Sequence, residues 1–355
     1  MNATRYKPPE LMMVCANEVQ LAQRNSIWFQ LNVGANTILA IGTVVTSAIF
    51  FHRLFKKKSH FSSSMNVLLG VNVLTSNLHS FIYGYIQYWS LIRALLYHDQ
   101  PCKIMFNEYE CFPYYSLNIL SRLMMITLYC AQTFNMLVIG IYPSLPESKI
   151  RGFALVAIAL ISSVGLCEII TNDGPNDNIQ GNCLQRQGRN LDELKEQLFT
   201  YLRISFGVFV ASNVALGLTY WRMKTKSNST VSKKYQSIAN YNASIVLLVI
   251  TALVMIALGV YSYATAYIVD HVKEIDPVNV GLWTMWLYTY TIAEFVLPAA
   301  LLLIPAIIKR QRKVKVAALT APMTPAEEQA KYFKSLANDW DAELARKYPE
   351  LAPVA

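Results

Sequence analysis

The chain has 355 residues, of which 54% are hydrophobic and only 15% charged, and its formal net charge is +9. A chain of this length with so few charges is too apolar to be a soluble two-domain protein. The composition therefore predicts a polytopic membrane protein, whose surroundings are a lipid bilayer and not nucleic acid.

Seven apolar windows are long enough to cross a bilayer as helices. They cover residues 27–51, 65–91, 115–142, 153–171, 198–221, 241–269 and 278–308. The pattern predicts an all-α membrane protein with a seven-helix transmembrane domain over 27–308, an N-terminal segment over 1–26 and a tail over 309–355. The first window is expected to direct insertion itself, because the apolar run from Leu11 to Ala16 is too short for a cleavable signal peptide.

Lysine and arginine are unevenly distributed between the two sets of loops. The segments after the first, third, fifth and seventh windows hold 16 of them, counting the tail to Lys315, and the segments on the other side hold 9. Because cytoplasmic loops are enriched in these residues, the N-terminus is predicted outside and the tail in the cytoplasm. Asn2 then opens an external Asn-Ala-Thr sequon and is a candidate glycosylation site.

Four of the six cysteines fall on the predicted outer side, where disulfides persist: Cys15, Cys102, Cys111 and Cys183. Four cysteines allow three connectivities. We favour Cys111 with Cys183, which would tie the start of the third window to the loop before the fifth, and Cys15 with Cys102.

Polar residues in the first two windows are placed at helical spacing. Gln30, Asn32 and Asn36 in the first more often mark hydrogen bonding between helices than a ligand site. In the second, His79 shares one face with Asn72, Ser76 and Tyr83, and this face is predicted to point into the bundle. A histidine on such a face is more often structural than a ligand contact, and both roles stay open.

The seventh window carries a carboxylate, Glu294, near its middle. Counted as one continuous helix, it places Trp283, Leu287, Tyr290 and Thr291 on the face of Glu294. Pro298 follows four residues later and is predicted to kink the helix at the same turn.

The third window supplies a possible counter-charge for Glu294. Its polar stripe contains Cys111, Tyr115, Asn118, Arg122 and Tyr129, and Arg122 lies at a depth similar to that of Glu294. An ion pair between Arg122 and Glu294 is therefore expected, either as a structural link or as part of activation. The candidate ligand contacts in the outer half of the bundle are Tyr115, Asn118, Arg122, His79, Trp283, Tyr290 and Glu294.

The tail contains a helix-start signal. Thr324-Pro325-Ala326-Glu327 is a capping box with proline at the first helical position. It predicts a short amphipathic helix whose apolar residues are Tyr332, Phe333, Leu336 and Trp340.

Several short motifs occur in a characteristic order along the seven windows. They are Cys15-Ala16-Asn17-Glu18, Phe61 with its serine run, Pro101-Cys102, Glu110-Cys111-Phe112, Val231-Ser232-Lys233-Lys234-Tyr235-Gln236, and the tail from Glu327 to Trp340. In this order the chain resembles the nematode chemosensory receptors of serpentine receptor class alpha (Sra) type. The resemblance implies a multi-pass plasma-membrane receptor of sensory neurons, expected in their cilia, that binds a small chemical ligand and signals through a heterotrimeric G protein.

Two positions depart from the wider class of rhodopsin-like receptors. Gly140-Ile141-Tyr142 stands where those receptors usually place a Glu-Arg or Asp-Arg pair, and Leu297-Pro298 replaces their common Asn-Pro. The expectation of G-protein coupling therefore depends on the overall resemblance and not on these motifs.

Other classes of membrane protein fit the sequence less well. A ligand-gated channel of the insect odorant-receptor kind also has seven spans, but its N-terminus would be inside, against the charge distribution. A transporter would show paired internal repeats with broken helices, and an opsin would need a lysine in the seventh window, which has none before Lys309. No His-Glu-x-x-His, Gly-x-Ser-x-Gly or P-loop pattern indicates an enzyme, and we expect no cofactor or metal.

Overall fold

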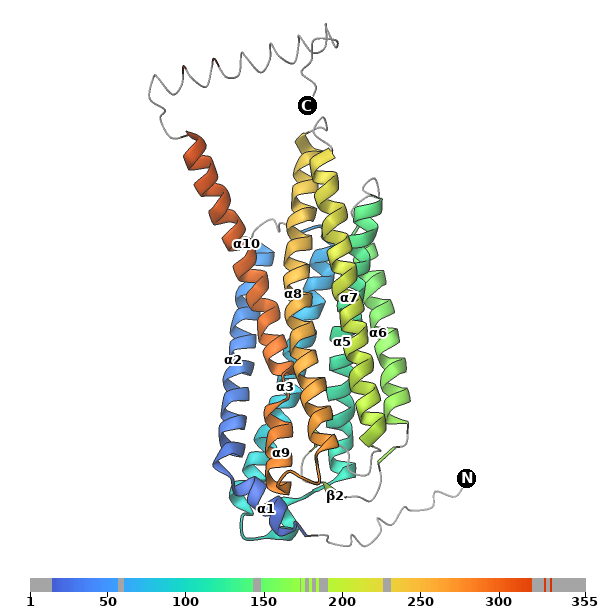
Figure 1. The fold of residues 1–355 in the computed structure, drawn as a ribbon, viewed down its shortest axis with the longest axis vertical. Helices are drawn as coiled ribbons and strands as arrows, with labels where there is room; N and C mark the ends of the chain where they lie inside the picture. The colour runs from blue at the N-terminus through green and yellow to red at the C-terminus, as the bar shows by residue number, and fades with distance from the viewer. Residues whose placement is uncertain are drawn as a thin grey trace. The chain divides into compact units, whose positions relative to one another are not determined.

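The computed structural model describes residues 15–56, 61–142, 148–172, 174–175, 179–180, 183–184, 191–225, 231–320, 329 and 333. Figure 1 labels its elements: α1 (Glu18–Asn25), α2 (Ile27–Lys56), α3 (Ser63–Leu96), α4 (Pro101–Ile104), β1 (Phe106–Asn107), α5 (Glu108–Ile141), α6 (Lys149–Thr171), β2 (Ile179–Gln180), α7 (Leu191–Thr225), α8 (Val231–Asp270), α9 (Pro277–Trp286) and α10 (Tyr290–Thr320). Met1–Pro305 form one compact unit and Ala306–Ala355 a second. Asn2 and the tail segment 324–340 lie outside the described residues, except for Gln329 and Phe333, which are helical.

Six helical stretches are long and apolar enough to cross a membrane. They are Ile27–Lys56, Glu108–Ile141, Lys149–Thr171, Glu193–Thr225, Ser237–Asp270 and Pro277–Ile307. The seventh long helix is α3, with 34 residues. It does not meet the same test of length and apolar character, and it turns Asn72, Ser76 and His79 into the bundle, where all three are fully buried. The predicted all-α bundle with seven spans is confirmed.

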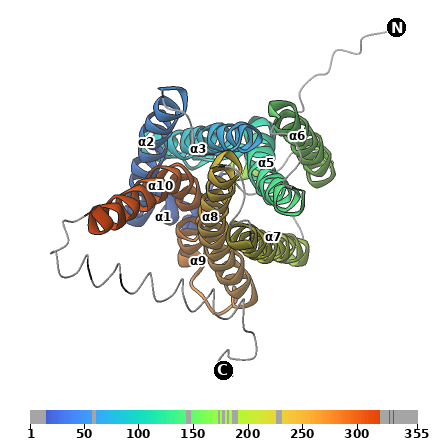
Figure 2. The ribbon, with the colours of Figure 1, turned by 90° about the horizontal axis from the view of Figure 1, so that it is seen from above.

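The main core lies between the helices that surround the centre of the bundle. Its buried side chains come chiefly from α3, α5, α8 and α10, with smaller contributions from α2 and α7. Helix α6 lies at the edge against α3 and α5 (Figure 2). It buries only Gly152, Ala159, Ser163 and Cys167, a narrow stripe of small residues that lets helices approach closely.

Gly152 lies directly against the backbone of α3, and it gives a testable expectation. A Cβ atom there would lie 2.8 Å from the carbonyl oxygen of Ser64 and 3.0 Å from the Cβ atom of Val67. Gly152→Ala is therefore expected to lower the free energy of unfolding by about 1–3 kcal/mol, because the α3 backbone has to move. Thermal unfolding of the purified protein measures the loss.

Gly165 provides the matched control on the same helix, since a Cβ atom there would meet no other atom within 4 Å. Gly165→Ala should leave stability unchanged or raise it slightly, because alanine favours the helix. Equal losses for the two variants would show that α6 and α3 do not approach each other at Gly152.

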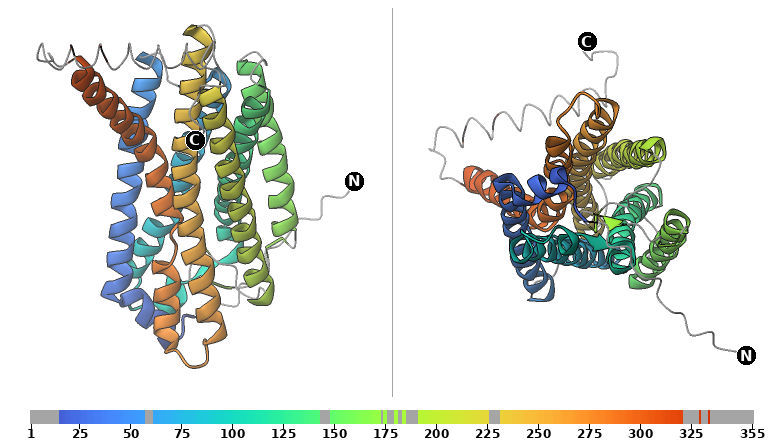
Figure 3. Two further views of the ribbon diagram at one scale, coloured as in Figure 1. Left: turned by 45° about the horizontal axis from the view of Figure 1, so that its top comes forward. Right: turned by 90° about the horizontal axis from the view of Figure 1, so that it is seen from below.

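One end of the bundle is closed by short elements and two disulfides, and we call it the disulfide end. Cys111 is bonded to Cys183 and Cys15 to Cys102, which confirms the favoured connectivity. Strands β1 and β2 pair antiparallel, with Phe106 opposite Gln180. Helix α1 begins with a capping box between Asn17 and Gln20 and lies across this end (Figure 3, right).

The seventh span is broken, which corrects the expectation of one continuous helix over 278–308. Helix α9 ends at Trp286, and α10 begins at Tyr290 (Figure 1). Trp283 is consequently 46% exposed, whereas Tyr290, Thr291 and Glu294 are buried. The predicted common face of Trp283 and Glu294 does not exist.

Two hydrogen bonds join the broken segment and the end of α9 to other helices. Asn32 Nδ2 donates to the carbonyl oxygen of Met285 at 3.4 Å, and Thr289 Oγ1 donates to that of Ala257 at 2.6 Å. The Asn32 bond gives a backbone carbonyl beside the break a partner, and such partners are the condition for an irregular backbone at membrane depth. The break is thus supported by α2 and α8.

Candidate functional site

The centre of the bundle holds a fully buried contact between an imidazole and a carboxylate. His79 Nδ1 of α3 pairs with Glu294 Oε1 of α10, and both side chains are 0% exposed. Ser80, the next residue of α3, donates a hydrogen bond from Oγ to Glu294 Oε2. Both carboxylate oxygens therefore have a partner on α3, and the contact links α3 to α10.

Arg122 does not provide the counter-charge that the sequence suggested. Among the described residues, the ion-pair partner of Glu294 is His79. The Arg122 guanidinium instead lies over two aromatic rings, 5.9 Å from the centroid of Tyr288 and 5.4 Å from that of Tyr290. These are cation–π contacts, which an arginine makes readily within about 6 Å of a ring. The prediction of an ion pair between Arg122 and Glu294 is wrong.

Tyr288, in the break between α9 and α10, connects these two parts of the centre. Its hydroxyl shares a hydrogen bond with His79 Nε2 at 2.8 Å. Its ring stacks on Tyr83 with centroids 4.5 Å apart, and Tyr261 meets it edge-on at 5.6 Å. Stacked and edge-on pairs are the favoured geometries of aromatic rings. Tyr288 is thus fixed by α3 and α8 as well as by its own chain.

A second set of hydrogen bonds holds the start of α10. Thr291 Oγ1 donates to Asn36 Oδ1 at 2.8 Å, and Asn36 Nδ2 donates to Asn32 Oδ1 at 3.1 Å. Asn32 in turn bonds the Met285 carbonyl at the end of α9. The prediction that polar residues of the first window bond between helices is confirmed for Asn32 and Asn36, while Gln30 is exposed.

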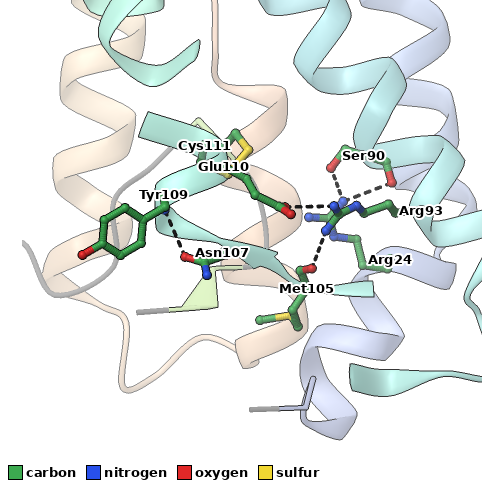
Figure 4. Close-up of a disulfide and its surroundings, with 9 residues drawn as sticks. Arg24, Ser90, Arg93, Met105, Asn107, Tyr109, Glu110 and Cys111 are labelled. Carbon is green, nitrogen blue, oxygen red and sulfur yellow. Dashed lines mark hydrogen bonds and ion pairs between the residues drawn. A yellow bond between two sulfur atoms is a disulfide. The ribbon is translucent and has the colours of Figure 1, made fainter. Parts of the chain in front are cut away.

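The disulfide end contains a second cluster, built on two arginines (Figure 4). Arg93 of α3 donates to the Met105 carbonyl oxygen at 2.6 Å and to Glu110 Oε2 at 2.9 Å. Its guanidinium lies 4.2 Å from the ring centroid of Phe106 in β1, and the Arg24 guanidinium lies 5.7 Å from the same centroid. Phe106 is therefore in contact with both cations.

Arg24 is the more buried of the two arginines. It donates from Nη1 to Ser90 of α3. Burial, and secondarily the charge of Arg93, lower the pKa of Arg24 to about 10. Because α1 carries Arg24, this contact fastens the N-terminal helix to α3 beside the two disulfides. No pattern in the sequence predicts a role for Arg24 or Arg93 beyond their charge.

With this geometry established, the chain can be compared with known proteins. The family model described as "Serpentine type 7TM GPCR chemoreceptor Sra" matches residues 11–340. The chain belongs to this Sra family.

Curated Sra proteins resemble the chain over nearly its whole length. Serpentine receptor class alpha-10 of Caenorhabditis briggsae is 25% identical over 346 residues, covering 91% of this chain and 97% of that protein. The protein of the same name from Caenorhabditis elegans is 26% identical, covering 91% and 96%. The chain is therefore a seven-transmembrane protein of a chemosensory receptor family.

The fold also resembles that of a solved receptor. The crystal structure of squid rhodopsin superposes with a TM-score of 0.58 at 13% identity, covering 94% of this chain and 96% of the other. At this identity the likeness shows the fold alone. It places the broken seventh span and the His79–Glu294 contact of the Sra chain inside a rhodopsin-like bundle.

The predicted ligand contacts of this Sra chain fall into three places. His79, Glu294, Arg122 and Tyr290 lie around Tyr288. Tyr115 packs in a separate cluster with Ile119, Leu123 and Tyr201, and Asn118 is buried on α5, the helix that also carries Tyr115. Trp283 lies apart on α9.

The sequence missed three residues of the centre: Ser80, Tyr261 and Tyr288. Ser80 gave no signal, because it lies off the face on which His79 was counted. Tyr288 could have been suspected from the run Tyr288-Thr289-Tyr290, whose β-branched and aromatic residues are weak helix formers. Its contact with His79 depends on the break, which the pattern did not show.

Proposed function

We propose that this Sra chain is a plasma-membrane chemosensory receptor of sensory neurons, located in their cilia, with its N-terminus outside. It binds a small molecule in the half of the bundle nearer the disulfide end and signals through a heterotrimeric G protein at the other end. The observation that carries the proposal is the buried His79–Glu294 contact beside the break in the seventh span.

This arrangement suits a receptor because a ligand shifts a protein only between states that it binds with different affinities. The break from Leu287 to Thr289 is the segment that would differ between two such states. Tyr288 and Thr289 in the break bond to the His79 side chain of α3 and to the Ala257 carbonyl oxygen of α8, and Asn32 of α2 bonds to Met285 at the end of α9. A tilt of α9 would therefore alter the contacts of Tyr288 with His79. The change would then reach α10 through Glu294.

Features at the opposite end support contact with a partner protein. Arg222 of α7 donates from Nη2 to the carbonyl oxygen of Ile141, the last residue of α5, at 2.6 Å. Tyr142 and Trp221 beside it are each 59% exposed. The sequence segments at this end also carry the larger share of lysine and arginine, as expected of a cytoplasmic face.

Topology provides the test of this proposal. Asn2 should be glycosylated in cells, so Asn2→Gln should remove an endoglycosidase-sensitive mass, and an epitope tag on the tail should be labelled only after permeabilisation. Asn228 and Asn242 also begin sequons, but on the proposed cytoplasmic side. Asn228→Gln is the matched control and should leave the mass unchanged.

The opposite result would remove the receptor proposal. Labelling of the tail tag on intact cells would place the tail outside, where it could not meet a G protein. It would leave the seven-span odorant channel with its N-terminus inside as the better description.

A further inference from the structure

A cavity opens on the side of the bundle near the disulfide end, between the start of α2, the end of α8 and α9. Its volume is about 510 Å³, within the range of small-molecule sites. Three of the six tryptophans of the chain line it: Trp28, Trp283 and Trp286. The lining of this cavity, which we call the tryptophan pocket, comes from three separate helices.

The chemistry of the tryptophan pocket favours an uncharged ligand. Besides the tryptophans it is lined by Ala264, Tyr267, Ile268, Asn279, Leu282 and Leu287, and none of these side chains is acidic or basic. Indole and phenol rings offer large apolar faces that stack on other rings. The Asn279 amide and the polar ring atoms are the groups able to orient a ligand.

The tryptophan pocket is more than a row of aromatic residues at the membrane interface. Tryptophan and tyrosine are enriched at that interface in general, where their rings lie at the level of the headgroups. Here Leu282 and Ile268, 5% and 4% exposed, belong to the wall, so the hollow reaches into the packed protein. A ligand dissolved in the bilayer could enter from the side without crossing the disulfide end.

The pocket also touches the break in the seventh span. Leu287 lines it, and the next residue, Tyr288, bonds His79. A molecule that presses on α9 and Leu287 therefore acts one residue away from the His79–Glu294 contact. The pocket and the His79–Glu294 contact are thus connected through adjacent backbone residues, without a chain of charged or polar side chains between them.

We propose that the tryptophan pocket binds an uncharged, largely apolar small molecule that enters from the lipid phase. The proposal rests on the receptor function proposed above and names the class of its ligand. It moves the ligand from the bundle interior, where Tyr115 and Asn118 lie, to the side wall formed by α9.

The test uses the full chain in phosphatidylcholine nanodiscs and N-phenyl-1-naphthylamine, an uncharged apolar aromatic probe that accepts tryptophan emission. The wild type should show a saturable component of energy transfer above the linear background from probe dissolved in lipid. Ala264→Phe fills the pocket without changing the tryptophans and should weaken the saturable component by about tenfold or more. Ala157→Phe, the same substitution at an exposed position of α6 outside the pocket, should leave it unchanged.

A second pair of variants guards against misfolding of Ala264→Phe. Trp286→Leu removes a wall of the pocket, and Trp221→Leu removes an exposed tryptophan of α7 outside it. The midpoint of the titration should rise only for Trp286→Leu. Since each variant loses one tryptophan, the comparison does not depend on the intensity of emission.

Three results would overturn the proposal. The first is the absence of a saturable component in the wild type, and the second is equal titration midpoints in the pocket and control variants. The third is that brominated lipid quenches the emission of the pocket tryptophans and that adding the probe does not reduce this quenching. The last would identify the occupant as a lipid acyl chain. If the probe does not bind but the tail is cytoplasmic, the pocket proposal is wrong and the receptor proposal stands. If the tail is external, the receptor proposal is wrong whether or not the probe binds.

Discussion

His79→Leu is expected to lower the free energy of unfolding by about 3–5 kcal/mol, the cost of leaving one partner of a buried ionic contact alone. The cost is high because both side chains are fully buried, and Glu294 would retain only Ser80. Glu294→Leu should cost less, since it removes the carboxylate and leaves His79 its hydrogen bond with Tyr288. Thermal unfolding of purified protein and the amount of receptor at the cell surface measure both losses.

The double variant His79→Leu with Glu294→Leu distinguishes a contact from two separate defects. Replacing both partners by apolar groups removes the unpaired polar atoms, so the double variant should be more stable than His79→Leu alone. The coupling energy between the two positions should then be about 1–3 kcal/mol.

Arg122 provides the control cycle, because its depth in the membrane predicts it as the partner of Glu294. In the structure its guanidinium lies over Tyr288 and Tyr290. Arg122→Leu with Glu294→Leu should therefore show the smaller coupling of the two cycles. Strong coupling to Arg122 and none to His79 would reverse the assignment of the pair.

Signalling gives a second readout of the same variants. If the receptor proposal holds, Glu294→Gln keeps the volume of the side chain and weakens its contact with His79. Basal nucleotide exchange on a heterotrimeric G protein should then rise at equal amounts of folded receptor, because α10 is less firmly held to α3.

The features that the sequence predicted well are those with strong one-dimensional signals. The seven spans follow from runs of about 20 apolar residues, a length set by the thickness of the bilayer. The disulfides were narrowed to three pairings by the loop positions of the cysteines. Asn32 and Asn36 are predicted to form hydrogen bonds between helices because unpaired amides are rare in apolar surroundings, and they bond Met285 and Thr291.

The features that the sequence did not predict depend on rotation about helix axes and on the local path of the backbone. Arg122 and Glu294 do lie in the same bundle, but depth does not tell which way a side chain points. The spacing predicts that His79 lies on the inward face of its helix but does not predict its partner. The partner depends on the rotation of α3 and α10 about their axes. The break at Leu287 has no proline or glycine to mark it. It is held by bonds to other helices, from Asn32 of α2 to the Met285 carbonyl oxygen and from Thr289 to the Ala257 carbonyl oxygen of α8.

Loss of the Cys111–Cys183 bond is expected to produce the second large effect. The bond joins residues 72 positions apart. On the chain-entropy account a loop of this length contributes roughly 4 kcal/mol of stability. Both sulfurs are buried with Ile82, Ile86 and Phe106, so alanine is a better replacement than serine, whose hydroxyl would be left unpaired.

The three variants Cys111→Ala, Cys183→Ala and the double variant should lose similar stability and surface expression, because each breaks the same bond. Cys15→Ala breaks the other disulfide and is the matched control. Combined with Cys111→Ala, it should lower stability further than either change alone. If the loss for Cys111→Ala with Cys183→Ala were instead the sum of the two single losses, the cysteines would have different partners, and β1 and β2 would have to be held together at the disulfide end by their strand pairing alone.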